Sequence, residues 1–252
     1  MELLIPDWHA PAHVGALTTL RAGGFSAAPY ADADGLPGLN LGAHVGDDPI
    51  HVAANRARLR RLLPQEPAWL SQVHSTAVAD AATTAAGAEA DGAVADRPGV
   101  VCVMMTADCL PVLFCDRAGR VVGAAHAGWR GLAGGVLERT VDAMRARGAQ
   151  DIMAWLGPAI GPARFEVGED VRTAFLASAI EHEAATAGAF AAIDGVPGKY
   201  LADIYQLARL RLQAGGVDDI TGGQWCTVSD PRFYSYRRDK TTGRMASLVW
   251  LK

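Results

Sequence analysis

One cysteine and two histidines lie in short polar breaks of an otherwise apolar middle region. Cys109 separates two apolar runs that are typical of strands, and His126 lies at the end of the next such run. His74 occupies a similar break further upstream. A thiol and two imidazoles on short rigid segments suit a three-ligand metal site, and they also suit a cysteine–histidine nucleophilic pair. Both interpretations predict chemistry, and therefore an enzyme.

Two kinds of chemistry remain open for these three side chains. Zinc favours nitrogen and sulfur donors, and a catalytic zinc site keeps a fourth position open beside three protein ligands. A bound zinc would keep Cys109 deprotonated and lower the pKa of its water. Without a metal, Cys109 could be the nucleophile and His126 its base. Geometry separates the two, because a metal needs all three donor atoms about 2 Å from one point, whereas the pair needs only one hydrogen bond.

Other polar residues are candidates for proton transfer and anion binding. Asp108 directly precedes Cys109 and could move a proton, although neighbours in a regular strand point to opposite faces. Arg130, in a glycine-containing turn before a predicted helix, could hold a phosphate together with backbone N–H groups. Arg56 and His44 are candidates for contact with an anionic or polar substrate. Neither a Walker loop nor a dinucleotide fingerprint is present, so we predict neither ATP nor NAD.

Composition and charge narrow the class of protein. Of the 252 residues 50% are hydrophobic and 20% are charged, with a net charge of −4, which is ordinary for a globular domain. No cluster of Lys and Arg stands out to neutralise a run of phosphates, so we expect no nucleic-acid partner. No uncharged apolar stretch is long enough to span a bilayer, so we expect no membrane partner. The four cysteines lack the density of a disulfide scaffold and no secretory signal precedes them, which predicts a cytoplasmic location.

Mixed strands and helices must position the reactive side chains. Apolar, partly β-branched runs predict strands at 100–104, 110–114, 121–125 and 152–156, and a final strand pair at 225–228 and 246–251. Helical periodicity predicts helices at 49–63, with Asp48 as its cap, and at 132–147, 169–179 and 200–214. Strands and helices do not alternate strictly, so we predict a layered α+β fold in a single domain, residues 1–252.

A series of short motifs occurs in an order that resembles a known family. The motifs are Thr18-Thr19 with Gly23-Gly24 and Ser26, Leu39-Asn40-Leu41-Gly42 with His44 to Asp47, Asn55-Arg56, Gln72-Val73-His74, Ala107 to Pro111, His126 to Gly131, Gly157-Pro158 with Ile160-Gly161, and Ser235 to Asp239. Together they resemble the bacterial YfiH-like laccase-domain family, also called multifunctional purine nucleoside phosphorylases and formerly polyphenol oxidases. The resemblance covers about Thr18 to Leu251. Leu20 departs from it, because it lengthens the usual Thr-Thr-Arg-x-Gly-Gly opening by one residue.

The resemblance implies a fold, a metal and an activity. The fold would be a four-layer α/β/β/α sandwich similar to a bacterial toxin cysteine-hydrolase domain, and the metal would be zinc on His74, Cys109 and His126. The activity would be phosphorolysis of adenosine, inosine and methylthioadenosine, together with deamination of adenosine. The partners would then be purine nucleosides and phosphate. Copper-dependent phenol oxidation is a weaker expectation, because a multicopper oxidase needs several histidine-rich clusters and the chain has only seven histidines.

Two other functions fit the same residues. The resemblance also implies peptidoglycan editing, in which a wrongly incorporated serine is removed from a muramoyl precursor by a zinc-water or by Cys109 and His126. A zinc-stabilised binding module for a nucleotide-like metabolite would use the same ligands without turnover. The sequence does not decide between a monomer and a homodimer.

Overall fold

The computed structural model describes residues 1–178 and 183–252, and its core is built from two large sheets. The first has four strands in the order β1-β2-β14-β6, all paired antiparallel: β1 (Leu3–Leu4), β2 (Val14–Thr19), β14 (Met245–Leu251) and β6 (Val101–Thr106). Every residue of β6 and β14 is buried, as expected for continuous apolar runs that have cover on both faces.

The second large sheet has six strands in the order β13-β9-β7-β8-β5-β4. They are β13 (Asp219–Gly222), β9 (Ile152–Leu156), β7 (Leu110–Asp116), β8 (Val122–Ala127), β5 (Gly92–Ala95) and β4 (Val78–Asp80). The four central strands are wholly buried and all pair antiparallel with one another, whereas β13 and β4 run parallel to their neighbours at the two edges.

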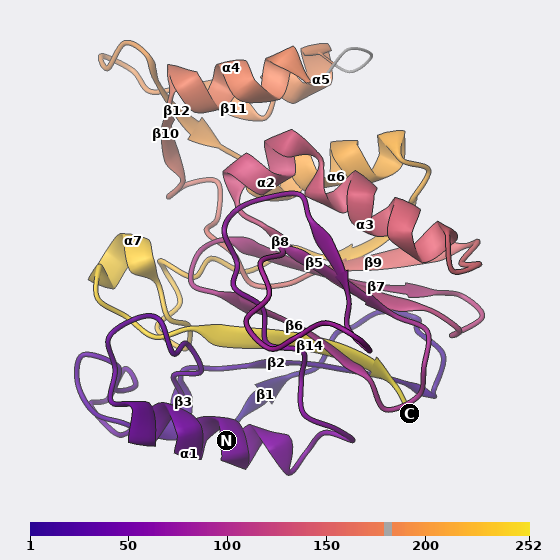
Figure 1. Ribbon diagram of the computed structural model, residues 1–252. Coiled ribbons are helices and arrows are strands. Elements are labelled where there is room, and N and C mark those ends of the chain that lie inside the picture. Colours follow the sequence, from indigo (N-terminus) through magenta and orange to yellow (C-terminus); the bar gives the residue numbers. More distant parts are fainter. Residues whose placement is uncertain (179–182) are drawn as a thin grey trace.

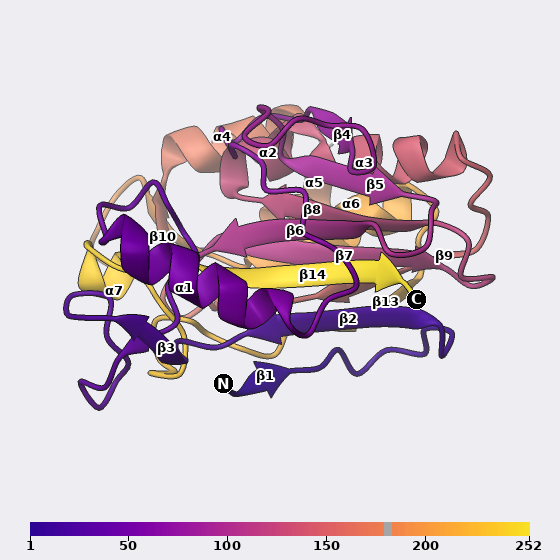
Figure 2. The same ribbon diagram turned by 60° about the horizontal axis from the view of Figure 1, so that its bottom comes forward.

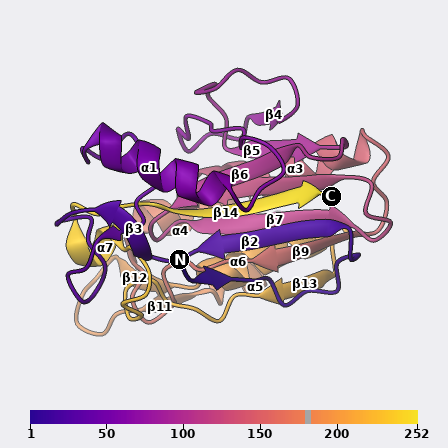
Figure 3. The same cartoon turned by 90° about the horizontal axis from the view of Figure 1, so that it is seen from below.

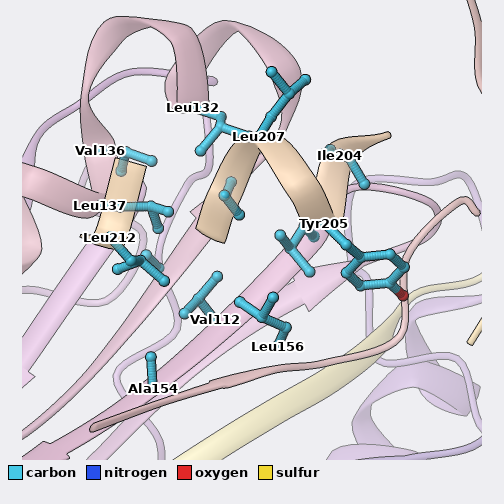
Figure 4. Close-up of a cluster of buried hydrophobic side chains, with 14 of the residues drawn as sticks. Val112, Leu132, Val136, Leu137, Ala154, Leu156, Ile204, Tyr205, Leu207 and Leu212 are labelled. Carbon is cyan, nitrogen blue, oxygen red and sulfur yellow. The ribbon is translucent and has the colours of Figure 1, made fainter. Parts of the chain in front are cut away.

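Helices cover the outer face of each sheet, which gives the predicted four layers (Figure 1). Helix α1 (Pro49–Arg60) lies across the four-stranded sheet, where Leu59 joins the cluster that contains Val103 and Leu248 (Figures 2 and 3). On the other side, α2 (Trp129–Gly134), α3 (Val136–Arg145) and α6 (Ile204–Ala214) pack on the six-stranded sheet. In Figure 4 the side chains of these helices point onto Val112 and Leu156 of β7 and β9.

The core between the two sheets completes the α/β/β/α sandwich. Met104 and Val249 of the four-stranded sheet belong to one buried cluster with Leu113 and Trp155 of the six-stranded sheet. None of these four side chains exposes more than 1% of its surface, so the sheets are held by a dry apolar interface. The predicted α+β fold with four layers is confirmed.

Smaller elements lie outside the two large sheets. They are β3 (Ala22–Ser26), the three-stranded sheet β10-β12-β11 with β10 (Glu166–Gly168), β12 (Lys199–Ala202) and β11 (Phe190–Ala192), and the helices α4 (Glu169–Ala177), α5 (Glu183–Ala187) and α7 (Tyr236–Asp239). Within residues 1–178 and 183–252, no helix combines the length and the apolar character that crossing a bilayer requires.

The predicted helix at 132–147 is wrong in its continuity. The structure has two helices, which meet at Gly135, where φ is 99°. A residue in the left-handed region ends an α-helix, and glycine adopts that conformation without steric cost. Helical periodicity includes Gly135 as a poor helix former within one helix, but in the structure Gly135 is the boundary between two helices.

Several other predicted boundaries also differ. Helix α1 ends at Arg60 instead of residue 63, although Asp48 caps it as predicted, accepting from the backbone N–H of Ile50 at 2.8 Å. The predicted helix 200–214 is β12 followed by α6, because the Asp203 side chain caps the helix by accepting from Tyr205 and Gln206. Helix α4 ends at Ala177, and position 179 of its predicted range lies outside the described residues. Residues 225–228 contain no strand, since 225 and 226 are irregular and 227 and 228 lie in a turn, and the strand lies earlier, at β13.

Candidate metal centre

The three side chains singled out from the sequence lie together in space. One donor atom from each of His74, Cys109 and His126 can be chosen so that all three lie within 4.8 Å of one another. The Cys109 Sγ lies 3.7 Å from the His74 Nε2. Donors bound at 2.0–2.3 Å to a tetrahedral ion stand roughly 3.5 Å apart, so the cluster needs only a small contraction to close on a metal. His74 is exposed, Cys109 half-buried and His126 buried, so the cluster opens to solvent on one side.

Strand register explains how two of these residues meet. Strand β7 begins at Leu110, which pairs with Ala127 at the end of β8. Cys109 therefore precedes β7 at the same end of the sheet at which His126 is the last residue but one of β8. Cys109 belongs to the short turn that leads from β6 of one sheet to β7 of the other. The candidate centre thus lies where the two sheets are joined.

Asp91 connects the two histidines of the cluster. It directly precedes β5, the other neighbour of β8, and its backbone carbonyl accepts from the His126 N–H at 2.7 Å. Its carboxylate accepts from the His126 Nδ1–H at 2.7 Å and from the N–H groups of Val73, His74 and Ser75 at 3.1, 3.0 and 2.6 Å. The Ser75 hydroxyl donates to it as well, at 2.9 Å. Sequence analysis did not select Asp91, whose only mark in the chain is its position before an apolar strand.

A glycine is required directly beside the ligands. A Cβ built on Gly128 would lie 2.7 Å from the His74 Cδ2 and 3.0 Å from the Cys109 Sγ. Contacts this short do not occur in proteins, so any side chain here would push the two ligands aside. The Gly128-Trp129 step after β8 therefore serves the cluster, in addition to starting helix α2.

The electrostatic environment separates Cys109 from the buried cysteines. Burial opposes ionisation of Cys109, but the neighbouring His126 and His74 outweigh it and lower the pKa of the thiol to about 6. Burial likewise disfavours charge on His126, but Cys109 and Asp91 raise the pKa of its imidazole to about 9. Burial instead raises the pKa of Cys115 to about 12. Of these two thiols, only Cys109 is poised to lose its proton near neutral pH, as a metal ligand must.

Two arginines and a histidine lie beside the cluster, and we call them the cationic cradle after the two arginines: His44, Arg56 and Arg244. The Arg56 Nε donates to the Leu41 carbonyl at 3.0 Å, and its guanidinium stacks 4.0 Å above the Trp69 ring. Burial lowers the pKa of His44, and the positive charges of Arg244, Arg56 and His126 lower it further, which places all three cations in its surroundings.

Arg244 comes to the cradle from the segment before β14. Its Nη1 donates to the Thr242 and Gly243 carbonyls at 3.1 Å, and its stem covers Gly42, which precedes His44 in the loop. Within the described ranges, neither Arg244 nor Arg56 forms an ion pair with a carboxylate within 4.0 Å. Sequence analysis found Arg56 and His44 but missed Arg244, because no motif marks a single arginine before a strand.

Two further residues predicted from the sequence, Asp108 and Arg130, are not among the three clustered side chains. Asp108 lies in the left-handed region with φ 89°, so it is not part of a regular strand. Its two carboxylate oxygens accept from the Thr227 hydroxyl and from the Arg237 N–H, each at 2.6 Å, and so anchor the segment around α7. Arg130 is exposed in the first turn of α2, with its guanidinium 4.2 Å from the centre of the Trp129 ring.

The fold and the cluster together define a four-layer α/β/β/α protein with a His₂Cys group that could hold a metal ion. The chain belongs to the family described as multi-copper polyphenol oxidoreductase laccase, whose family model matches residues 15–252.

Named relatives and solved structures support this assignment. The chain is 53% identical over 250 residues to a purine nucleoside phosphorylase of Pseudomonas aeruginosa, covering 99% of this chain and 98% of the relative. It is 52% identical over 254 residues to the purine nucleoside phosphorylase YfiH of Escherichia coli, covering 99% of both. A Neisseria meningitidis crystal structure superposes with a TM-score of 0.90 at 50% identity, covering 100% of both chains. YlmD of Geobacillus stearothermophilus gives 0.86 at 32% identity, covering 100% of this chain and 97% of YlmD.

Proposed function

We propose that this chain is a zinc-dependent purine nucleoside phosphorylase that acts on adenosine, inosine and methylthioadenosine. The observation that carries the proposal is the position of the His₂Cys cluster beside a cationic cradle whose two arginines form no ion pair with a carboxylate of the described residues. The names of the relatives in Pseudomonas aeruginosa and Escherichia coli support the same activity. The four free cysteines are consistent with a reducing, cytoplasmic setting.

The donor set fits zinc. One thiolate and two imidazoles are the nitrogen and sulfur donors that zinc prefers, and three protein ligands leave one position open. Among the described residues, this is the one group of histidine, cysteine and acidic side chains close enough to hold an ion. Chemistry with several coppers needs several such groups, so we favour zinc over copper. When bound, zinc would supply Lewis acidity at the open position.

The cationic cradle fits the second substrate. In phosphorolysis a phosphate oxygen forms a bond to the ribose C1′ while the bond from C1′ to the purine nitrogen breaks, giving free purine and ribose 1-phosphate. The phosphate must therefore be held against the ribose in a fixed orientation. The guanidinium groups of Arg56 and Arg244 can donate paired hydrogen bonds to phosphate oxygens, and His44 can donate another. Arg130, predicted from the sequence as a further phosphate contact, is a candidate for the approach of the anion from solvent.

The departing purine needs a proton, because it leaves with the electron pair of the broken bond. Asp108 remains our candidate for moving that proton, since it is adjacent to Cys109 in the chain. Its hydrogen bonds to Thr227 and Arg237 fix the position of the carboxylate. The same site could deaminate adenosine by replacing the amine at C6 with the oxygen of water and releasing ammonia, and the products distinguish the two reactions.

The proposal is tested by incubating zinc-loaded protein with adenosine, with and without phosphate, and identifying products by chromatography. We expect adenine and ribose 1-phosphate only when phosphate is present, and inosine if the protein also deaminates. Cys109→Ala should reduce turnover on the order of 10³-fold. Cys226→Ala is the matched control, because Cys226 is also half-buried but lies outside the cluster, and it should keep nearly wild-type turnover. Product formation that survives Cys109→Ala would refute the proposal.

A second function has an observation of its own. His126 lies between Cys109 and the Asp91 carboxylate, which is the order of nucleophile, base and orienting acid in a cysteine hydrolase. In that chemistry the Cys109 sulfur would attack an amide carbonyl, His126 would give a proton to the departing amine, and water would then release the acid. A peptidoglycan-editing amidase acting on serine-containing muramoyl precursors is therefore the alternative. These precursors become the next substrates if adenosine gives no product above the Cys109→Ala control.

A further inference from the structure

We propose that Asp91 is the positioning residue that assembles the metal centre by holding both histidine ligands at once. This inference rests on the proposed function only in assuming that His74, Cys109 and His126 bind a metal. Asp91 has no exposed surface, yet its carboxylate is satisfied by five donors from the ligand segments. Every one of these donors belongs to a metal ligand or to a residue next to one.

The first task of Asp91 is to set the protonation and orientation of His126. A carboxylate can only accept, so the Nδ1 of His126 carries a hydrogen that points at the Asp91 Oδ1. The Nε2 then faces Cys109, and its lone pair would serve a metal once the metal displaces the proton on that nitrogen. Carboxylate partners of this kind are common for metal-bound histidines, because they fix the ring and make the ligand nitrogen more basic.

The second task is to fix the backbone that carries His74. The φ angle of His74 is 60°, a left-handed conformation that a non-glycine residue adopts at a cost. Three successive N–H groups, from Val73 to Ser75, converge on the Asp91 carboxylate in a nest that favours an anion. The charged hydrogen bonds offset the conformational cost, and they aim the His74 ring at Cys109.

Charge balance gives a third reason for a carboxylate at this position. A divalent metal with one thiolate and two neutral imidazoles leaves one positive charge next to a buried region. The Asp91 carboxylate neutralises that charge. An amide of the same shape would leave the positive charge uncompensated, and it would also turn an N–H group toward donors that need an acceptor.

The inference is tested by measuring zinc affinity in competition with a chromogenic chelator, together with the absorption spectrum of the cobalt-substituted protein. Asp91→Asn should weaken zinc binding by about 10- to 100-fold and alter the cobalt spectrum. Asp116→Asn is the matched control. Asp116 is also a buried carboxylate that accepts from backbone N–H groups, but it lies at the opposite end of β7. The Asp116→Asn protein should be less stable than the wild type but should keep the wild-type zinc affinity and cobalt spectrum.

The outcomes separate this inference from the proposed function. The inference is overturned if the Asp91→Asn protein folds and has the same zinc affinity and cobalt spectrum as the Asp116→Asn protein. It is also overturned if the wild-type protein binds no metal. If Asp91→Asn does not fold, Ser75→Ala decides, because it removes the hydroxyl donor to Asp91 and, besides that, only an acceptor for the Ala77 N–H. A several-fold loss of affinity there supports the inference, and unchanged binding overturns it. If zinc binding depends on Asp91 but the wild-type protein forms no adenine, the phosphorylase proposal is refuted and the inference about Asp91 stands.

Discussion

A buried aspartate lies at each end of the β7–β8 hairpin, Asp116 within the hairpin and Asp91 in the segment before the neighbouring strand β5, and the two have different partners. At one end, the Asp116 carboxylate accepts from the N–H groups of Arg120 and Val121, and so closes the turn between the strands. At the other end, Asp91 accepts from segments that are distant in sequence, including the His126 ring. Both carboxylates are almost fully buried, at 1% and 0% exposure. Burial and hydrogen bonding alone therefore do not distinguish a structural aspartate from one that serves a site.

The two aspartates differ in whether the groups that donate hydrogen bonds to them can still bind a metal. The donors at Asp116 are the backbone N–H groups of Arg120 and Val121 and the Arg120 side chain, all from its own turn, and none of them can bind a metal. At Asp91 the partner His126 keeps a second ring nitrogen, and His74 keeps its whole side chain. The hydrogen bonds fix these two residues without consuming their capacity to bind. An organising carboxylate can thus be recognised by the unused donor atoms of the groups that it holds.

The largest expected effect comes from adding one carbon at each end of the hairpin. Gly128→Ala would place a methyl group against His74 and Cys109, and zinc affinity should fall on the order of 100-fold. Gly119→Ala changes the turn at the other end, where φ is 65° and the new Cβ would lie 2.2 Å from the His13 Nε2. It should lower Tm by several degrees, at about 3 °C for each kcal/mol. Equal losses of zinc affinity in Gly128→Ala and Gly119→Ala would contradict the expectation that only one end of the hairpin supports the metal centre.

An intermediate effect is expected from the arginines of the two ends. Arg244→Met should raise the KM for phosphate about 10-fold, with a smaller change in kcat, because it removes charge-assisted hydrogen bonds to the anion. Arg120→Met, beside Asp116, should leave both constants unchanged. If Arg130 assists the approach of phosphate, Arg130→Met should raise the KM for phosphate by less than Arg244→Met does. Steady-state rates at varied phosphate concentration provide the measurement, and an unchanged KM in Arg244→Met would remove Arg244 from the cradle's function.

The smallest effect concerns pH. Burial raises the pKa of Asp91, but hydrogen bonds from His126 and Ser75 outweigh burial and lower it from 3.8 to about 2. A carboxyl whose pKa is lower in the folded state stabilises the protein fully above about pH 4, and this stabilisation is lost as the pH falls through 2. In metal-free protein, the stability difference between wild type and Asp91→Asn should therefore be about 1 kcal/mol smaller at pH 3 than at pH 7. Urea unfolding at the two pH values tests this, and a constant difference would argue against an ionised Asp91.

Residue type and local pattern predicted much of the molecule. Cys109, His74 and His126 each stand in a polar break next to an apolar run, and such breaks mark strand ends, where side chains from different strands meet. The buried strands were predictable for the same reason, since continuous apolar runs have few alternatives. The four layers were predicted from the family resemblance, and the packing of Met104 against Leu113 confirms them.

What sequence reasoning missed depends on register and on single backbone angles. Asp91 and Arg244 are isolated polar residues before apolar strands, and only strand pairing brings them to the cluster. The break at Gly135 is set by one positive φ, which a helical periodicity does not reveal. Residues 200–202 carry a helix-compatible pattern but pair as β12, because the cap at Asp203 delays the helix. Tertiary pairing overrides local preference at these places.

The position of β14 between β2 and β6 gives the two halves of the site different folding histories. A nascent chain that has left the ribosome as far as Ala127 contains every metal ligand together with Asp91. It still lacks the inner strand of the four-stranded sheet and, with it, Arg244. Contacts between residues close in sequence form sooner than contacts across the whole chain. Under the proposed function, an incomplete chain would therefore contain all the zinc ligands before it contains the complete phosphate site, so zinc content would not report the amount of finished protein.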